Sequence, residues 1–237
     1  MGAAFMAALA RGFSGFGAAL VFVPVASAAL GPRVAIPLML VVDFVMALPM
    51  FPPATRRCNW RDVLLMAAGA VAGVPIGTAV LTRADPSVMR WSIAVLIAVL
   101  LAVLASGWRY AGRPAVPLTA SVGLSAGVLS GAAQVGGPPV VVYWLGGSIP
   151  PLIVRANLIA FFGLSSTVSL AAYLAGGLLT QQVLWLALVT APLYGLGVWL
   201  GARMFGIASE TVFRRVCYGL IALSALTSLP VLDALWR

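Results

Sequence analysis

The sequence predicts an all-α polytopic membrane protein built from two related halves, and three observations carry this prediction. Hydrophobic residues make up 62% of the 237 residues and charged residues only 8%. A soluble domain of this length cannot bury so much apolar surface, so the expected solvent is a bilayer. The apolar residues fall into eight segments joined by short loops. Two of these segments, 3–30 and 115–146, are each interrupted by glycine at matching positions in the two halves.

The other six segments have the length of a single membrane crossing, about 20 residues. In chain order they are 34–52, 63–82, 89–107, 152–175, 183–203 and 212–232. The two interrupted segments are too long for one straight crossing and too short for two. Because no connecting loop is long enough for an extramembrane domain, we expect one integral membrane domain over 1–237, with repeat 1 at 1–113 and repeat 2 at 114–237.

The interruptions themselves have a distinctive composition. The first is Gly12-Phe-Ser-Gly-Phe-Gly17, with Pro24 beyond it, and the second is Ser130-Gly-Ala-Ala-Gln-Val-Gly-Gly-Pro-Pro139. Non-helical backbone at membrane depth must be satisfied by protein or by a water-filled cavity. Paired interruptions in two halves are typical of secondary transporters that work by alternating access around a midplane site. We therefore expect a substrate site where the two breaks meet.

A set of identical residues that recur in the same order in both halves supports the repeat. Each match is weak alone in so apolar a sequence, but the set keeps its order with a nearly constant offset. The pairs are Ser14-Gly15 with Ser130-Gly131, Val63 and Gly77 with Val183 and Gly197, and Val88 and Arg90 with Val212 and Arg214.

Arginine, the only basic residue type in the chain, favours an inverted repeat. If all eight segments cross once, the loop arginines divide six against seven; if each broken segment turns back, they divide nine against four. The second division is the asymmetry expected from the positive-inside rule. Loop 53–62 also has three arginines, whereas its repeat partner 176–182 has none. We therefore expect re-entrant broken segments, inverted halves and both termini outside the cytoplasm, with eight plain crossings as the alternative.

The chemistry of the breaks favours an anion. A half-helix that restarts after a break directs unpaired N–H groups and the positive end of its dipole toward the break, and glycine allows a ligand to approach those groups closely. Close helix packing is the alternative use of the same small residues. The substrate-binding candidates at the breaks are Ser14, Gly15, Phe16, Gly17, Ser130, Gly131, Gln134, Gly136, Gly137 and Pro138.

Three polar residues elsewhere in apolar segments are further candidates. Arg155 either extends to the membrane interface or faces the cavity and binds an oxyanion. Asn157, two residues deeper, is harder to explain by snorkelling and is expected beside Arg155 at the edge of the site. Asp43 is the only acid well inside an apolar segment, and such carboxylates are functional by default. Asp43 is therefore either the partner of an arginine or, in a chain without histidine, the candidate proton-coupling group.

Several function classes are disfavoured. The chain has no nucleophile–base pair at recognisable spacing, so no catalytic residues are expected. Cys58 and Cys217 have no zinc-type spacing and histidine is absent, so neither a metal nor another cofactor is expected. The net charge of +9 comes from arginines scattered among short loops, which points to membrane orientation and away from nucleic acid. The expected partners are a small anion and the lipid bilayer, and a homo-oligomer is left open.

The residues at and after the breaks resemble the TauE/SafE family, also called sulfite exporters. The resemblance rests on Gly127 to Gly131, Gly136 to Val140, Arg155-Ala-Asn157, Gly197 to Gly201 and Phe213-Arg-Arg215, with Gly12 to Gly17 and Pro24 in the first half. It implies movement of small sulfur-containing anions, such as sulfite, thiosulfate or sulfoacetate-like organosulfonates, across the bacterial inner membrane. An anion channel, or a transporter of non-sulfur organic anions, is the alternative.

Overall fold

The protein is represented by a computed structural model that describes residues 1–83, 116–147 and 149–207, with a few positions between 209 and 219. All regular structure in this part of the chain is helical. Five of the described helices are long and apolar enough to cross a membrane, which confirms the all-α, multi-pass prediction. The predicted crossings 89–107 and, apart from a few positions, 212–232 lie outside the described residues.

The first broken segment forms two short helices, α1 (Gly2–Ser14) and α2 (Ala18–Leu30). Each has 13 residues and is therefore about 20 Å long, too short to cross a hydrocarbon core of about 30 Å. The chain reverses between them at Gly15 and Gly17, whose φ angles of 82° and 90° are accessible mainly to glycine. The break is narrower than predicted, because Gly12, Phe13 and Ser14 belong to α1.

Longer helices complete the described part of the first half. A long, slightly interrupted helix follows α2 and consists of α3 (Pro32–Ala47), the 3-10 turn η1 (Leu48–Met50) and α4 (Phe51–Thr55). Its prolines at 49, 52 and 53 account for the interruption, because proline removes a backbone donor and crowds the preceding turn. The next helix, α5 (Trp60–Arg83), has the length of a full crossing.

The second half repeats this order. Its broken segment forms α7 (Val116–Ala133) and α8 (Gly137–Leu145), followed by the long helices α9 (Pro151–Ala175) and α10 (Gln181–Phe205). The second break is also narrower than predicted and spans 134–136, with Gln134 at a φ of 59°. Pro138 and Pro139 lie inside α8 because proline is tolerated in the first turn of a helix.

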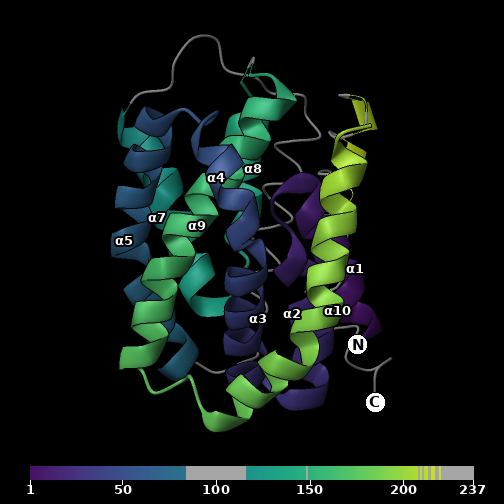
Figure 1. The fold of residues 1–237 in the computed structure, drawn as a ribbon. Coiled ribbons are helices and arrows are strands. Elements are labelled where there is room, and N and C mark those ends of the chain that lie inside the picture. The colour runs from purple at the N-terminus through teal and green to yellow at the C-terminus, as the bar shows by residue number, and fades with distance from the viewer. Residues whose placement is uncertain are drawn as a thin grey trace.

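Both broken segments turn back on themselves. In the second, Thr119 near the start of α7 lies 2.6 Å from Tyr143 near the end of α8, measured between the two hydroxyl oxygens, so α7 and α8 are antiparallel. In the first, α1 runs parallel to α10, since successive glycines of α10 at 197 and 201 meet successive turns of α1. α2 then returns to the other end of the molecule, where it joins α3 (Figure 1).

Glycine allows the closest helix contacts in the molecule. Gly69, Gly73 and Gly77 of α5 lie against the backbone of α7, at sites where even a methyl group would meet main-chain atoms. Gly123, Gly127 and Gly131 of α7 lie equally close to α5. In a bilayer, small residues of this kind are what permit two helix backbones to approach. The same device joins α1 to α10 through Gly12, Gly197 and Gly201.

These contacts divide the described helices into two bodies. The first body is α1, α2, α3 and α10, and the second is α5, α7, α8 and α9, with α3 and α4 touching α9 across the junction (Figure 1). Each body therefore combines helices from both halves of the sequence: α10 packs on α1, and α5 packs on α7. In the order of the two halves, α1 corresponds to α7 and α5 corresponds to α10, so each pair combines a first helix of one half with a last described helix of the other. The inverted arrangement of the repeats stays a prediction.

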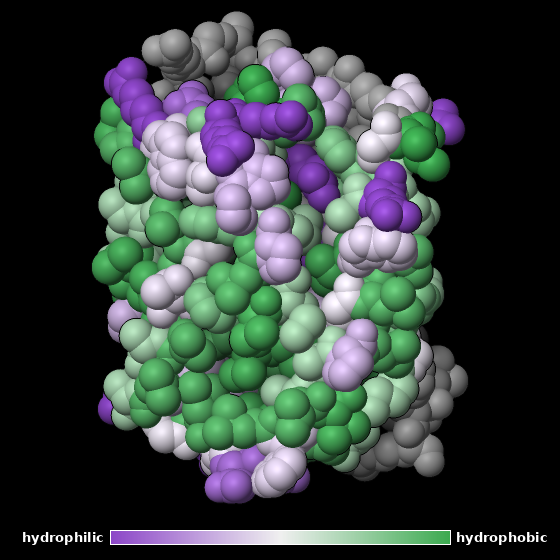
Figure 2. Space-filling view, viewed as in Figure 1, coloured by the Kyte–Doolittle hydropathy of each residue, from purple (hydrophilic) through white to green (hydrophobic). Residues whose placement is uncertain are grey.

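The surface is apolar around the middle of the molecule, and hydrophilic residues gather mainly at one end (Figure 2). Arg56, Arg57 and Arg61 are exposed at that end, where α4 leads into α5. Arg33 and Arg83 are exposed at the opposite end, where an Arg33 Nη2 donor lies 2.9 Å from the Thr82 carbonyl oxygen. We call the first of these the arginine-rich end. By the positive-inside rule it is the expected cytoplasmic end.

Cysteine labelling tests this topology. In a background with Cys58→Ser and Cys217→Ser, Arg56→Cys and Gln182→Cys should react with a membrane-impermeant maleimide from opposite sides of the membrane, because both positions are exposed at opposite ends of the molecule. Right-side-out and inverted vesicles give the two measurements. Reaction of both cysteines from the same side would reject the turned-back segments and support eight plain crossings.

Candidate functional site

A small cavity of about 40 Å³ lies between the two breaks. One water molecule needs roughly 10–15 Å³ of such space, so the cavity has room for about three waters or one small oxyanion. Its walls come from both bodies. The lining consists of Arg11, Phe16, Gly17, Ala18, Ala19, Leu20, Met39 and Asp43 from α1, α2, α3 and the first break, and of Ser130, Gln134, Val135, Gly137, Phe162 and Ser166 from α7, α8, α9 and the second break.

Two helix N-termini border this cavity. The first residues of α2 line it, and α8 begins at Gly137, which also lines it. The first N–H groups of a helix have no partner within the helix, and they form the positive end of its dipole. A methyl group added to Gly137 would lie 2.8 Å from the Phe16 ring. Glycine at this position therefore lets the two breaks meet face to face.

The carbonyl ends of α1 and α7 are satisfied differently. At the end of α1, Arg155 donates to the Phe13 and Gly12 carbonyl oxygens at 2.9 Å and 2.6 Å, and Arg11 donates to the Gly15 carbonyl. At the end of α7, the neutral side chains of Gln134 and Tyr173 donate to the Ser130 and Gly131 carbonyl oxygens at 2.8 Å and 2.7 Å. Side chains therefore occupy the carbonyl ends, while the N–H ends of α2 and α8 are directed to the cavity.

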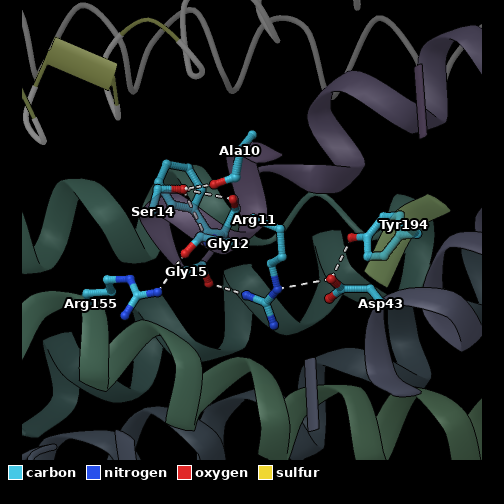
Figure 3. A network of polar contacts seen from close by, with 9 residues as sticks. Ala10, Arg11, Gly12, Ser14, Gly15, Asp43, Arg155 and Tyr194 are labelled. Carbon is cyan, nitrogen blue, oxygen red and sulfur yellow. Dashed lines mark hydrogen bonds and ion pairs between the residues drawn. The ribbon is translucent and has the colours of Figure 1, made fainter. Parts of the chain in front are cut away.

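Arg11 carries the positive charge nearest the cavity. Its side chain is 5% exposed, and its Nε donates to the Asp43 carboxylate at 3.0 Å. The same carboxylate oxygen accepts from the Tyr194 hydroxyl at 2.7 Å (Figure 3). The Arg11 guanidinium also lies 5.6 Å from the centre of the Phe162 ring. Four helices thus hold one guanidinium in place: α1 carries it, and α3, α9 and α10 contact it directly or through Asp43.

Arg155 is half-buried and directed toward α1. Besides its two bonds to α1 carbonyls, its guanidinium lies 4.4 Å from the centre of the Phe205 ring. A cation at a helix C-terminus is favourable, because that end of the dipole is negative. Arg155 does not line the small cavity but borders a second, larger one.

The predicted site residues divide into two groups. Phe16, Gly17, Ser130, Gln134, Gly137 and Asp43 line the small cavity, whereas Ser14, Gly15, Gly131, Gly136, Pro138, Arg155 and Asn157 do not. Close packing accounts for Gly131, which meets the backbone of α5. Asn157 is fully buried, and its Oδ1 accepts from the Asn59 backbone N–H at 2.7 Å, so it anchors the start of α5. Whether any of these residues binds substrate stays a prediction.

Ser14 stabilises the first break through contacts with two backbone carbonyls. Its hydroxyl oxygen lies 2.8 Å from the Ala10 carbonyl oxygen and 2.9 Å from the Phe16 carbonyl oxygen. These contacts bridge the last turn of α1 and the residue between the two positive-φ glycines. Ser14 therefore fixes the geometry of the break rather than facing the cavity.

Two residues of the site were missed in the sequence. Arg11 stands inside the first apolar segment beside Gly12 and belongs to neither side of the loop-arginine count. An arginine in that position is costly unless it has a partner, and this signal could have identified it. Nothing in the sequence marked Tyr194, because an aromatic residue in an apolar helix usually packs in the core.

Comparison with known proteins gives the chain a family. The family model described as "Sulfite exporter TauE/SafE" matches residues 1–228. The chain belongs to this family. TauE/SafE proteins are membrane exporters and not enzymes.

One curated relative is described as "Probable sulfite/organosulfonate exporter TauE" from Cupriavidus necator. This chain is 30% identical to it over 193 residues, which covers 77% of this chain and 73% of the relative. No solved structure matches this TauE/SafE chain.

The Arg11–Asp43 pair can be tested through stability. Arg11→Met should lower the free energy of unfolding by about 3–5 kcal/mol, because it leaves a largely buried carboxylate without its counter-charge. Equilibrium unfolding of the purified protein in detergent measures the change. Arg33→Gln is the matched control, since Arg33 is exposed and makes one hydrogen bond worth about 1 kcal/mol.

A double variant separates the pair from simple packing. Arg11→Met with Asp43→Leu removes both charges and should recover much of the lost stability. A double variant no more stable than Arg11→Met alone would show that the pair is not what stabilises this region.

Proposed function

We propose that this TauE/SafE protein is a secondary transporter that exports a small sulfur oxyanion or organosulfonate across the bacterial inner membrane. In this proposal the small cavity is the substrate site, and residues 1–113 and 114–237 act as inverted repeats around it. The observation that carries the proposal is the convergence on one cavity of two helix N-termini and the buried guanidinium of Arg11. The sulfur substrate class rests on the family and on the description of the Cupriavidus necator relative.

The cavity suits an oxyanion in charge, geometry and size. Sulfite has oxygen acceptors on one central atom, and guanidinium and backbone N–H groups donate to such oxygens by charge-assisted bonds. Gln134 lines the same space, and its amide nitrogen donates to the Ser130 carbonyl and the Tyr173 hydroxyl beside it. A volume of about 40 Å³ favours an ion with few atoms.

The two bodies provide a means of alternating access. The cavity lies at their junction, with α1, α2 and α3 on one wall and α7, α8 and α9 on the other. Close glycine-mediated packing joins α1 to α10 in one body and α5 to α7 in the other, and fewer helices meet across the junction than within the bodies. Rocking of one body against the other around a fixed site is the usual movement of transporters built from repeats. In this proposal, each opening exposes the cavity to one side of the membrane.

Asp43 supplies the coupling step of the proposal. Among the described residues, the titratable groups in contact with it are Arg11 of α1 and Tyr194 of α10. An anion that binds Arg11 takes the place of Asp43 and leaves the carboxylate without its cationic partner. A proton on Asp43 then restores the charge balance, so that the anion and a proton bind together.

Flux measurements with the cavity variants test the site. Gly137→Val should reduce sulfite flux in proteoliposomes at least about tenfold, because the added side chain would force Phe16 into the cavity. Gly2→Val is the matched control, since a side chain at Gly2 meets nothing within 4 Å. Gln134→Leu should weaken anion binding by roughly 1–3 kcal/mol, the usual cost of removing one partner of a buried polar contact. Wild-type flux and affinity in both cavity variants would place the substrate site elsewhere.

Asp43→Asn tests the coupling separately. The asparagine cannot accept a proton from solvent, so sulfite flux should lose its dependence on a pH gradient while sulfite binding persists. Flux is compared in proteoliposomes with and without an imposed gradient, and the gradient should still drive Gly2→Val. If Asp43→Asn responds to the gradient as wild type does, Asp43 is a structural partner of Arg11 and coupling lies elsewhere. Saturation of the flux at high sulfite would distinguish this transporter from a channel.

A further inference from the structure

A second cavity, which we call the vestibule, lies between the two bodies toward the arginine-rich end. Its volume is about 430 Å³, against about 40 Å³ for the small cavity between the two breaks, which, as the proposed midplane site, we call the midplane cavity. Sites for small organic molecules have volumes of roughly 300–1,000 Å³. Its walls are the end of α3, η1, α4, the first turns of α9, and α10.

The vestibule combines positive charge with apolar walls. Two arginines line it, Arg57 from the turn after α4 and Arg155 from α9, and no carboxylate is among its described lining residues. Arg203 adds a third cation nearby, stacked 3.8 Å from the centre of the Trp199 ring. Most of the remaining lining is apolar: Met46, Met50, Leu152, Ile159, Val198 and Trp199. Inorganic sulfite would leave most of this surface in contact with water.

Arg155 connects the vestibule with the midplane cavity. It borders the vestibule while it donates to the Gly12 and Phe13 carbonyls at the end of α1. Two residues further on, the Gly15 carbonyl accepts from Arg11, which lines the midplane cavity. The backbone of residues 12–15 therefore lies between Arg155 and Arg11, each of which borders one of the two cavities (Figure 3).

We propose that the vestibule is a second anion site, which binds an amphiphilic anion with one acidic head group and a short apolar chain. The head group lies between Arg57 and Arg155, and the chain packs on the methionines and Trp199. Alkanesulfonates have this chemistry, and so does the head group of an anionic lipid. As an entry site for substrate at the arginine-rich end the vestibule rests on the proposed function, because it would hold the anion before transfer to the midplane cavity.

Binding of alkanesulfonates of increasing chain length tests the proposal. The full-length protein in phosphatidylcholine nanodiscs is titrated by calorimetry with methane-, butane- and hexanesulfonate. Each added methylene should tighten binding by roughly two- to fourfold, since it moves apolar surface out of water. Trp199→Ala should flatten this dependence. Equal affinities along the series would overturn the proposal.

Arginine variants locate the head group. Arg57→Gln should weaken hexanesulfonate binding by about tenfold, as expected for the loss of one charge-assisted contact. Arg56→Gln is the matched control, because Arg56 is the exposed neighbour that does not line the vestibule. An equal loss of affinity in both variants would mean that general surface charge attracts the anion, and this result would also overturn the proposal.

The two sources of the head group are separated by lipid composition. In nanodiscs containing phosphatidylglycerol, a lipid occupant would compete with hexanesulfonate and would remain bound to wild type, but not to Arg57→Gln, in native mass spectrometry. That result would support the site and assign it to lipid, whereas unchanged hexanesulfonate affinity assigns it to soluble anions. Sulfite flux that is lost in Gly137→Val, together with binding that ignores chain length, would retain the proposed function and reject the vestibule alone.

Discussion

The structure depends on one constraint: the backbone of two broken helices must be satisfied at membrane depth. In water these carbonyl and N–H groups would be solvated, but a bilayer offers no such partners. Arg11 and Arg155 serve the carbonyls that end α1, and Gln134 and Tyr173 serve those that end α7. The N–H ends of α2 and α8 then border the cavity. The positive character of the site is thus a consequence of how the chain satisfies its breaks.

The two breaks contribute unequally to the charge of the site. The first is held by two guanidinium groups, and the second by a neutral amide and a phenol. Among the described residues that line the small cavity, the one cation is Arg11, which is balanced by Asp43 from a neighbouring helix. Under the proposed function, Arg11 exchanges this partner for a substrate anion, and a proton on Asp43 then compensates for the loss of its cationic partner. This makes the ion pair suitable for a cycle of binding and release.

Much of the candidate site was accessible from the sequence, but not its connections. Glycine clusters marked both breaks, and Asp43 was identified because a carboxylate inside an apolar segment is costly and is therefore usually functional. The partners of Asp43 lie 32 and 151 residues away, in α1 and α10, and no local pattern links such positions. Asn157 was predicted at the edge of the site, and the structure adds that its Oδ1 accepts from the Asn59 backbone N–H at the start of α5. The direction of a polar side chain on a buried helix depends on neighbours that the local sequence does not specify.

The sequence by itself determined the solvent, the helical class, the two breaks and the family, because apolar length and glycine placement are local properties with a strong physical meaning in a bilayer. Tertiary structure alone decided which glycines pack and which border a cavity. It also decided that helices from both halves form each body, and that Arg155 borders the vestibule while Arg11 lines the small cavity between the breaks. These outcomes depend on how close the helices approach one another. That approach depends on contacts between residues far apart in the chain, such as those of α5 with α7 and of α1 with α10.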